Sequence, residues 1–277
     1  NAQVSVPTPK WGEFVKILES FTEFENIQIK PAIQHSKYSF IKLIVRVKNK
    51  IVADGLKDHL ILSTDVETYL SAAEFNEFMD DPNSIVVDIR NYYESEVGRF
   101  DNAICPDADT FKDLLPLVKE LLKTKKKNKL LLYCTGGIRC EKASAYLKYH
   151  NFEDVNQLQG GIISYIQQVK EDDLECKFKG KNFVFDSRMG ENITDDIISN
   201  CHQCGETSDN HIDCNNDACH ILFIQCSKCS EKYEQCCSIE CMEFNKLSPD
   251  KQRILRKDPD QVVSKTRNSA SIKPRLS

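Results

Sequence analysis

A short apolar run that leads into a cysteine and a glycine-rich loop most constrains the fold of this 277-residue chain. Residues 129–142 read K-L-L-L-Y-C-T-G-G-I-R-C-E-K. The continuous apolar run 130–133 is typical of a strand covered on both faces, as in a parallel sheet. Small and apolar residues then recur at helical spacing, at Cys140, Ala143, Ser144 and Leu147. The pattern predicts an α/β fold in which Cys134 lies at a strand–loop–helix turn.

The loop after Cys134 is suited to stabilising a negative charge. It consists of Thr135, Gly136, Gly137 and Ile138, and Arg139 follows it. Successive backbone N–H groups and the N-terminus of a helix stabilise anions, and an arginine adds a full positive charge. We therefore expect Cys134 to have a lowered pKa and to react as a thiolate. The alternative is an inert, buried cysteine that precedes a glycine turn.

The spacing of this loop indicates the kind of chemistry. Arg139 follows Cys134 after four residues, one fewer than in the C-x5-R loop of cysteine phosphatases. The resulting C-x4-R loop resembles the active site of the rhodaneses, whose cysteine carries a persulfide. Two further segments resemble that family, the strand and charged turn at 85–103 and L-Q-G-G-I-I-S-Y-I at 158–166. The resemblance covers about 66–172 and implies a parallel-sheet rhodanese domain with Cys134 and Arg139 as catalytic residues.

Asp88 and Arg90 follow the predicted strand at 85–89 and are candidate supporting residues. Open α/β sheets place their sites at the carboxyl ends of parallel strands, which favours a functional role. Ion pairs are also common at such ends, and pairing of Arg90 with Glu94 would simply tie the turn together. We favour the structural interpretation.

Residues 1–65 are expected to form a small α+β domain. Val4 and Val6 suggest a strand, the apolar stripe from Trp11 to Leu18 a helix, and Ile27 and Ile29 a second strand. The alternation at 43–47 suggests a third strand. The order β-α-β-β is most of a ferredoxin-like unit, whose first strand and helix would be missing from this chain.

Nine of the thirteen cysteines lie between residues 201 and 241, several of them in C-x2-C pairs. Such pairs are typical of structural Zn²⁺ sites, and a metal-binding role favours a reducing cytoplasm. We expect a Cys-rich domain at 201–245, joined to the rhodanese domain by a linker at 173–200. Eight ligands would make two sites, with the cysteines paired either in sequence order or interleaved. The alternative is a module of free thiols or disulfides. The eight expected ligands are Cys201, Cys204, Cys214, Cys219, Cys226, Cys229, Cys237 and Cys241.

Charge is distributed unevenly along a chain whose net charge is −5. Residues 251–277 carry eight Lys/Arg and two acidic residues, so this part of the basic tail at 246–277 has a net charge of +6. A basic tail is a plausible electrostatic contact for RNA. The lysine-rich run 123–127 is more simply the solvated end of a helix. No apolar run reaches the 18 residues that a membrane-spanning helix needs, so we expect no membrane partner.

Taken together, the three parts resemble the bacterial tRNA uridine hydroxylases (TrhO, YceA-like). The resemblance rests on C-T-G-G-I-R-C-E-K-A-S-A at 134–145 and on the cysteine cluster that ends in C-S-K-C and C-C-S-I-E-C. It implies hydroxylation of the wobble uridine in a tRNA anticodon loop to 5-hydroxyuridine, with molecular oxygen as co-substrate and Cys134 as the essential cysteine.

Two other functions remain open at this point. A plain sulfurtransferase would need only the rhodanese domain and a persulfide on Cys134. A zinc-dependent interaction protein with a vestigial rhodanese would not need Cys134 at all. The residues also leave the hydroxylation chemistry open. Cys134 could add to C6 of the uracil ring, or a persulfide or sulfenate on Cys134 could react with oxygen.

Overall fold

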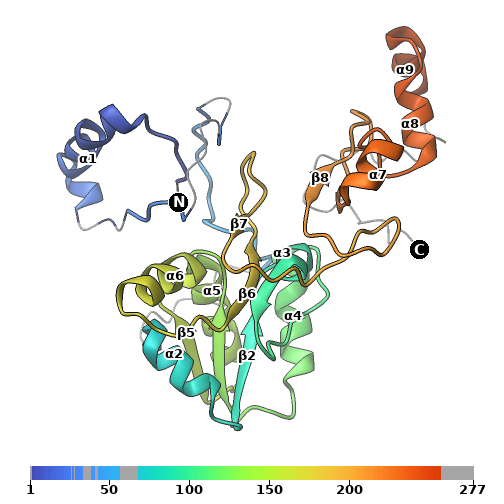
Figure 1. Cartoon of the computed structure of the whole chain (residues 1–277). Helices are drawn as coiled ribbons and strands as arrows, with labels where there is room; N and C mark the ends of the chain where they lie inside the picture. The colour runs from blue at the N-terminus through green and yellow to red at the C-terminus, as the bar shows by residue number, and fades with distance from the viewer. Residues whose placement is uncertain are drawn as a thin grey trace.

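A four-stranded parallel sheet forms the centre of the molecule (Figure 1). The computed structural model describes residues 2–25, 27, 29–33, 39–40, 43–56 and 68–256. The strand order is β1-β5-β4-β2. The strands predicted from the apolar runs at 85–89 and 130–133 are confirmed as β2 and β4. The bounds are β1 Thr68–Leu70, β2 Ser84–Asp88, β4 Lys129–Tyr133 and β5 Asp154–Leu158.

Helices cover both faces of this sheet, as the continuous apolar strands require. Leu130 and Leu132 pack into one apolar cluster with α4 and α5, whereas Leu131 and Tyr133 pack into a second cluster with α2 and α6. The predicted α/β rhodanese fold with a parallel sheet is therefore confirmed. The bounds are α2 Ala72–Met79, α4 Phe111–Leu121, α5 Ile138–Tyr149 and α6 Gly161–Glu171.

The predicted linker at 173–200 is wrong. This segment contains β6 (Phe178–Asn182) and β7 (Glu191–Asn192), which form a small antiparallel sheet with β3 (Gly98–Phe100). Phe178 is fully buried against the sheet's second apolar cluster. The linker prediction failed because β6 reads F-K-G-K-N, and its charged and glycine residues hide a strand whose hydrogen-bonding partner lies about 80 residues earlier in the chain.

The N-terminal segment contains the predicted helix, α1 (Trp11–Glu19), flanked by the short 3₁₀ turns η1 (Thr8–Lys10) and η2 (Thr22–Phe24). The three strands expected before residue 48 are not formed by the described residues. A strand requires a neighbour for its backbone hydrogen bonds, and an alternating pattern does not supply one. Val45 and Val47 are accordingly 85% and 97% exposed. The ferredoxin-like unit is thus not observed in the part of the chain that the structure describes.

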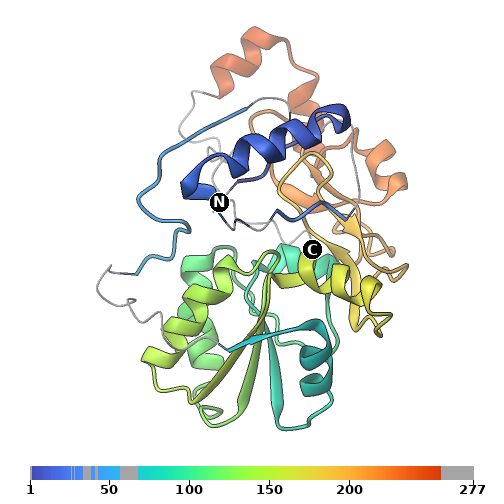
Figure 2. The ribbon, with the colours of Figure 1, turned by 90° about the vertical axis from the view of Figure 1, so that its left-hand side faces the viewer.

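The Cys-rich unit is built on one short hairpin of β8 (His211–Asp213) and β9 (Leu222–Ile224), followed by α7 (Ser227–Lys232), α8 (Ile239–Asn245) and α9 (Pro249–Leu255). The basic tail beyond residue 256 lies outside the described residues. Both this unit and the N-terminal segment lie beyond the carboxyl ends of the sheet strands (Figures 1 and 2). No helix in the described part of the chain is long and apolar enough to cross a membrane.

Candidate active site and cysteine clusters

Cys134 directly follows β4 at the carboxyl edge of the sheet and is 1% exposed. The backbone N–H of Gly137 donates a hydrogen bond to its Sγ atom at 3.1 Å. Gly137 immediately precedes α5 and has a φ of 97°, a conformation that L side chains rarely adopt. Glycine at this position therefore lets the loop turn back towards the sulfur.

The surroundings of Cys134 favour its thiolate. Burial alone would raise the pKa of Cys134, but a hydrogen bond from Cys140, the charge of Arg139 and the Gly137 amide lower it to about 6. Burial raises the pKa of Cys105 to about 11 and also raises that of Cys176. Cys140 is fully buried on the core-facing side of α5, where its spacing placed it, and it also serves as a donor to Cys134.

Arg139 is paired with Glu94, the residue that the sequence suggested as a partner of Arg90. Its guanidinium donates to both carboxylate oxygens of Glu94, at 2.5 and 2.8 Å, and also to Thr135 Oγ1 at 3.2 Å. Glu94 is completely buried in α3 (Tyr92–Val97). Thr135, from the predicted loop, donates its hydroxyl to the same carboxylate at 3.3 Å. Glu94 therefore belongs to the site, and the pairing of Glu94 with Arg90 that the sequence suggested does not occur.

Asp88 and Arg90 form a buried ion pair with each other instead. Arg90 Nη2 lies 2.6 Å from Asp88 Oδ2, and Nε lies 2.9 Å from Oδ1. Nη2 also donates to the carbonyl of Gly98 at 2.6 Å, which ties the end of β2 to the start of β3. Burial opposes the charge on Arg90, but Asp88 more than compensates and holds the pKa of Arg90 above its usual range. These contacts favour the structural role over a direct part in chemistry.

The turn before α6 closes the site from the other side. The N–H groups of Ile162 and Ile163 donate to the carbonyls of Cys134 and Thr135 at 2.9 and 3.2 Å. Gly161 makes this approach possible, since a Cβ atom there would lie 2.4 Å from the Cys134 carbonyl oxygen. The family-like segment at 158–166 thus fixes the backbone of the Cys134 loop.

Lys30 is also a residue of the site, although no pattern in the sequence points to it. Its Nζ atom donates to the carbonyls of Gly136 and Gly160 at 3.2 and 3.0 Å. It precedes Gly136 by 106 residues and carries no local motif. Only the tertiary structure brings it to the loop.

The eight cysteines expected to bind metal fall into two groups of four. The first group combines the pair before the β8–β9 hairpin with the pair at the start of α7, and the second combines the residues after β8 with those before and within α8. All thirteen cysteines of the chain are free thiols, and Cys236 belongs to neither group. The structure therefore selects the interleaved pairing, with Cys201, Cys204, Cys226 and Cys229 in one group and Cys214, Cys219, Cys237 and Cys241 in the other.

The sulfur geometry fits Zn²⁺. In each group all four Sγ atoms lie within 4.8 Å of one another. The Cys204–Cys226 and Cys219–Cys237 sulfurs are 3.6 and 3.7 Å apart. Four thiolates at about 2.3 Å from a tetrahedral zinc would be about 3.8 Å apart, close to these distances. Each group would hold one structural zinc.

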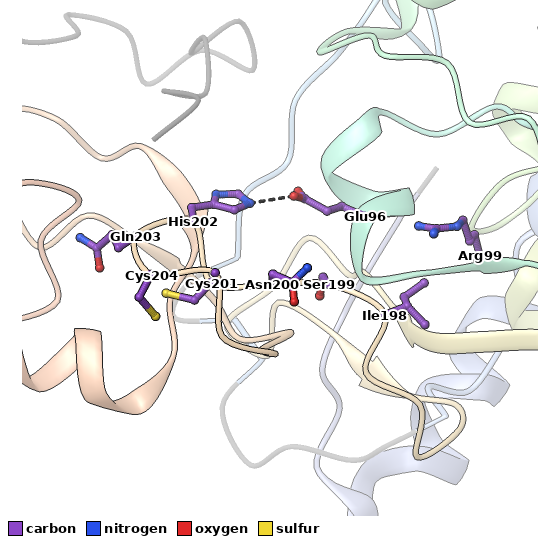
Figure 3. Close-up of a pocket in the computed structure, with 10 residues that line it drawn as sticks. Glu96, Arg99, Ile198, Ser199, Asn200, Cys201, His202, Gln203 and Cys204 are labelled. Atoms are coloured by element: carbon purple, nitrogen blue, oxygen red, sulfur yellow. Dashed lines mark hydrogen bonds and ion pairs between the residues drawn. The ribbon is translucent and has the colours of Figure 1, made fainter. Parts of the chain in front are cut away.

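A histidine beside the first cysteine group connects it to the rhodanese domain (Figure 3). His202 Nε2 lies 2.7 Å from Glu96 Oε1, and its Nδ1 accepts the backbone N–H of Ile224 at 3.3 Å. Glu96 belongs to α3, the helix that also carries Glu94. A shallow pocket of about 450 Å³ adjoins this contact, with Arg99 on its far side. The cysteine unit is thus anchored to the helix that holds Arg139.

Comparison with known proteins agrees with this geometry. The family model "Rhodanese-like domain" matches residues 71–168, and "Rhodanase C-terminal" matches 179–242. The "tRNA uridine(34) hydroxylase" of Leptospira interrogans is 51% identical over 280 residues, covering 100% of this chain and 75% of that protein. The chain belongs to the tRNA uridine(34) hydroxylase family. The Erwinia tasmaniensis member is 47% identical, covering 98% of this chain and 79% of its own length.

Membership of the hydroxylase family confirms the resemblance drawn from the C-T-G-G-I-R-C loop and the cysteine spacing. The rhodanese match lies inside the predicted 66–172 domain. The second match begins within β6 and includes all nine clustered cysteines, which agrees with the structured segment found where a linker was expected.

Proposed function

We propose that this protein hydroxylates uridine 34 of tRNA, the wobble position of the anticodon, to 5-hydroxyuridine, with molecular oxygen as co-substrate. The observation that carries the proposal is the buried Cys134 thiolate, held by the Gly137 amide, Cys140 and Arg139. Relatives that align with nearly the whole chain are named tRNA uridine(34) hydroxylase, which supports the proposal. The requirement for oxygen rests on the family resemblance.

A thiolate can activate C5 of uracil through the neighbouring carbon. C6 is electrophilic because it is conjugated to the C4 carbonyl, so Cys134 Sγ can add to it and leave an enolate whose nucleophilic carbon is C5. C5 then takes one oxygen atom of O₂, while two electrons and two protons from an external thiol donor convert the other atom to water. Loss of the C5 proton and of Sγ from C6 restores the ring.

Cys134 is only 1% exposed, so the uridine base has to enter the site to reach the sulfur. The uridine has to leave the anticodon stack and displace the groups that cover the loop. Extrusion of a base costs a few kcal/mol, and contacts to neighbouring phosphates would offset it. The N-terminal segment, the lysine-rich run 123–127 and the basic tail are the candidate surfaces for those contacts.

Nucleoside mass spectrometry of tRNA tests the proposal. Cells that lack the gene should lack 5-hydroxyuridine at position 34, and the wild-type gene should restore it. Cys134→Ser and Cys134→Ala should not restore it, whereas Cys105→Ser serves as the matched control and should. Persistence of the modification with Cys134→Ala would contradict the proposal.

The route through C6 has its own test. Mass analysis of Cys134 after trapping on an anticodon stem–loop should find the nucleotide attached to this residue. If Cys134 instead carries an extra sulfur or oxygen atom and no nucleotide, the persulfide or sulfenate route is correct.

Sulfur transfer is the second candidate, favoured by the C-x4-R loop itself. It would be supported if the purified protein formed thiocyanate from thiosulfate and cyanide while tRNA from the deleted strain was unchanged. The intact surroundings of Cys134 do not favour a vestigial rhodanese.

A further inference from the structure

The N-terminal segment delivers a cation to the active-site loop. Lys30 Nζ donates to Gly136 O on the Cys134 loop and to Gly160 O on the turn before α6. The two glycine loops are in contact, since a Cβ atom on Gly137 would lie 3.5 Å from the Cα atom of Gly160. The Lys30 ammonium therefore bridges two backbone segments that together enclose Cys134.

The segment that carries Lys30 is docked rather than loosely placed. Gln167 Nε2, on α6, donates to the carbonyl of Pro31 at 3.2 Å. Ile33 packs against the apolar cluster formed by α2 and α6. Contacts from Lys30, Pro31 and Ile33 thus hold the segment along α6.

Lys30 differs from Arg139 in the groups that it contacts near Cys134. Arg139 is next to the sulfur, but its charge is offset by the bidentate pair with Glu94, and Asp88 acts on it from the end of β2. Within the described part of the chain, the bonded partners of Lys30 are carbonyl oxygens and not carboxylates. Burial lowers the pKa of Lys30, whereas Cys134 and Glu141 favour its charged form.

We propose that Lys30 is a positioning residue of the active site, which clamps the two glycine loops together and supplies a positive charge that helps to hold Cys134 as the thiolate. This proposal rests on Cys134 as the reactive residue of the proposed function. It does not depend on hydroxylation, because the thiolate can be measured without tRNA.

The test is the pH dependence of Cys134 alkylation by iodoacetamide, followed by peptide mass spectrometry in the full chain. Lys30→Met keeps the length of the side chain and removes its charge. We expect the midpoint of the rate profile to rise by about half to one pH unit, so that alkylation below the midpoint slows roughly three- to tenfold. Lys30→Arg should keep the midpoint near that of the wild type.

Lys10→Met is the matched control, because Lys10 lies in the same N-terminal segment but pairs with Glu13 on the surface. It should leave the profile unchanged. If Lys30 only shielded the sulfur sterically, the result would differ. Lys30→Met would then raise the plateau rate of alkylation at high pH by exposing the sulfur, and the midpoint would not move. That outcome would overturn the proposal.

Two further checks keep the result interpretable. If Lys30→Met lowers the melting temperature, Lys30→Gln, which retains a hydrogen-bond donor, gives the same comparison of midpoints. An unmoved midpoint in both variants, together with normal 5-hydroxyuridine formation by the wild type, would reject the role of Lys30 and leave the proposed function standing.

Discussion

Arg139 donates two hydrogen bonds to the buried carboxylate of Glu94, with Nη1–Oε1 and Nη2–Oε2 distances of 2.5 and 2.8 Å. Paired donors of this kind fix the plane of the guanidinium as well as its position. The pair therefore locks α3 to the start of α5 and limits the positive field that Arg139 exerts on Cys134. The thiolate is stabilised by Cys140 and by the Gly137 N–H as well as by the charge of Arg139.

Glu94→Gln should make Cys134 more acidic while weakening the fold. The change removes the carboxylate charge but keeps the shape of the side chain, so the charge of Arg139 acts on the sulfur with less compensation. We expect the midpoint of Cys134 alkylation to move below the wild-type value. Leaving Arg139, whose side chain is 14% exposed, without its carboxylate should lower the free energy of unfolding by about 3 kcal/mol, measured by urea denaturation.

Arg139→Ala provides the opposite charge change for comparison. It should raise the midpoint of Cys134 alkylation, because it removes the positive charge and leaves Glu94 unpaired. A midpoint that moves upward in both variants would show that loop geometry, and not charge, controls the thiolate.

The pH dependence of Cys134 reactivity follows from its lowered pKa. Only the thiolate reacts with an alkylating agent, and the pKa of Cys134 is about 6. We expect the rate to rise as pH increases through about 6 and to be nearly constant from about 7 to 8. Cys105, whose pKa is raised to about 11, should react slowly throughout this range.

Peptide mass spectrometry of the folded protein measures the two rates together. The same cysteines in urea-unfolded protein should both titrate near the ordinary value of about 8.5. Equal rates for Cys134 and Cys105 in the folded protein at pH 7 would contradict the assignment of Cys134 as the reactive thiol.

Two glycines near Cys134 should differ sharply in their tolerance of a methyl group. Gly161→Ala would place a Cβ atom 2.4 Å from the carbonyl oxygen of Cys134, at a φ of 69°. The contact is with backbone, which cannot rotate away, so we expect a loss of more than about 2 kcal/mol in the free energy of unfolding. Thermal and urea denaturation measure this loss.

Gly136→Ala is the matched control in the same site. A Cβ atom there meets nothing within 4 Å, and its φ is not in the left-handed region. The free energy of unfolding should change by less than about 0.5 kcal/mol. If the two variants were equally stable, the close approach of the α6 turn to the Cys134 carbonyl would be wrong.

Local patterns were enough to predict the centre of this molecule. The apolar run before Cys134 and the helical spacing after it gave β4, the loop and α5, because each depends on neighbouring residues only. The start of α2 is equally local, because the side chains of Ser71 and Glu74 form a capping box there. The eight cysteines of the two groups were also predicted, since two C-x2-C pairs and the close spacing of the other four cysteines are visible locally in the sequence.

Contacts between distant segments were not predictable in this way. Glu94 matched a family signature, but nothing in its spacing shows that it pairs with Arg139 and not with Arg90. Lys30 reaches the loop only through the docking of the N-terminal segment, and β6 depends on a partner strand across the rhodanese domain. The strands predicted before residue 48 are not formed by the residues that the structure describes there, because alternation alone cannot supply a neighbouring strand.

The interleaved cysteine pairing predicts how metal content responds to double substitutions. We expect two zinc ions per chain in the wild type. Cys201→Ser with Cys226→Ser removes two ligands from one group and should leave one zinc. Cys201→Ser with Cys214→Ser removes one ligand from each group and should reduce occupancy of both sites.

Zinc content measured by atomic emission after gel filtration separates the two pairings, because pairing in sequence order predicts the reverse result for the two double variants. Cys236→Ser is the matched control. Cys236 is fully buried beside the second group but belongs to neither group, so the variant should retain two zinc ions.

Chelation of the metal should unfold the Cys-rich unit, since binding free energy and folding free energy are coupled in such small sites. The parallel sheet has its own apolar clusters, so Cys134 should still be alkylated after chelation. If chelation abolished the alkylation of Cys134, the contact between His202 and Glu96 would be needed to hold α3 and the active-site loop in place.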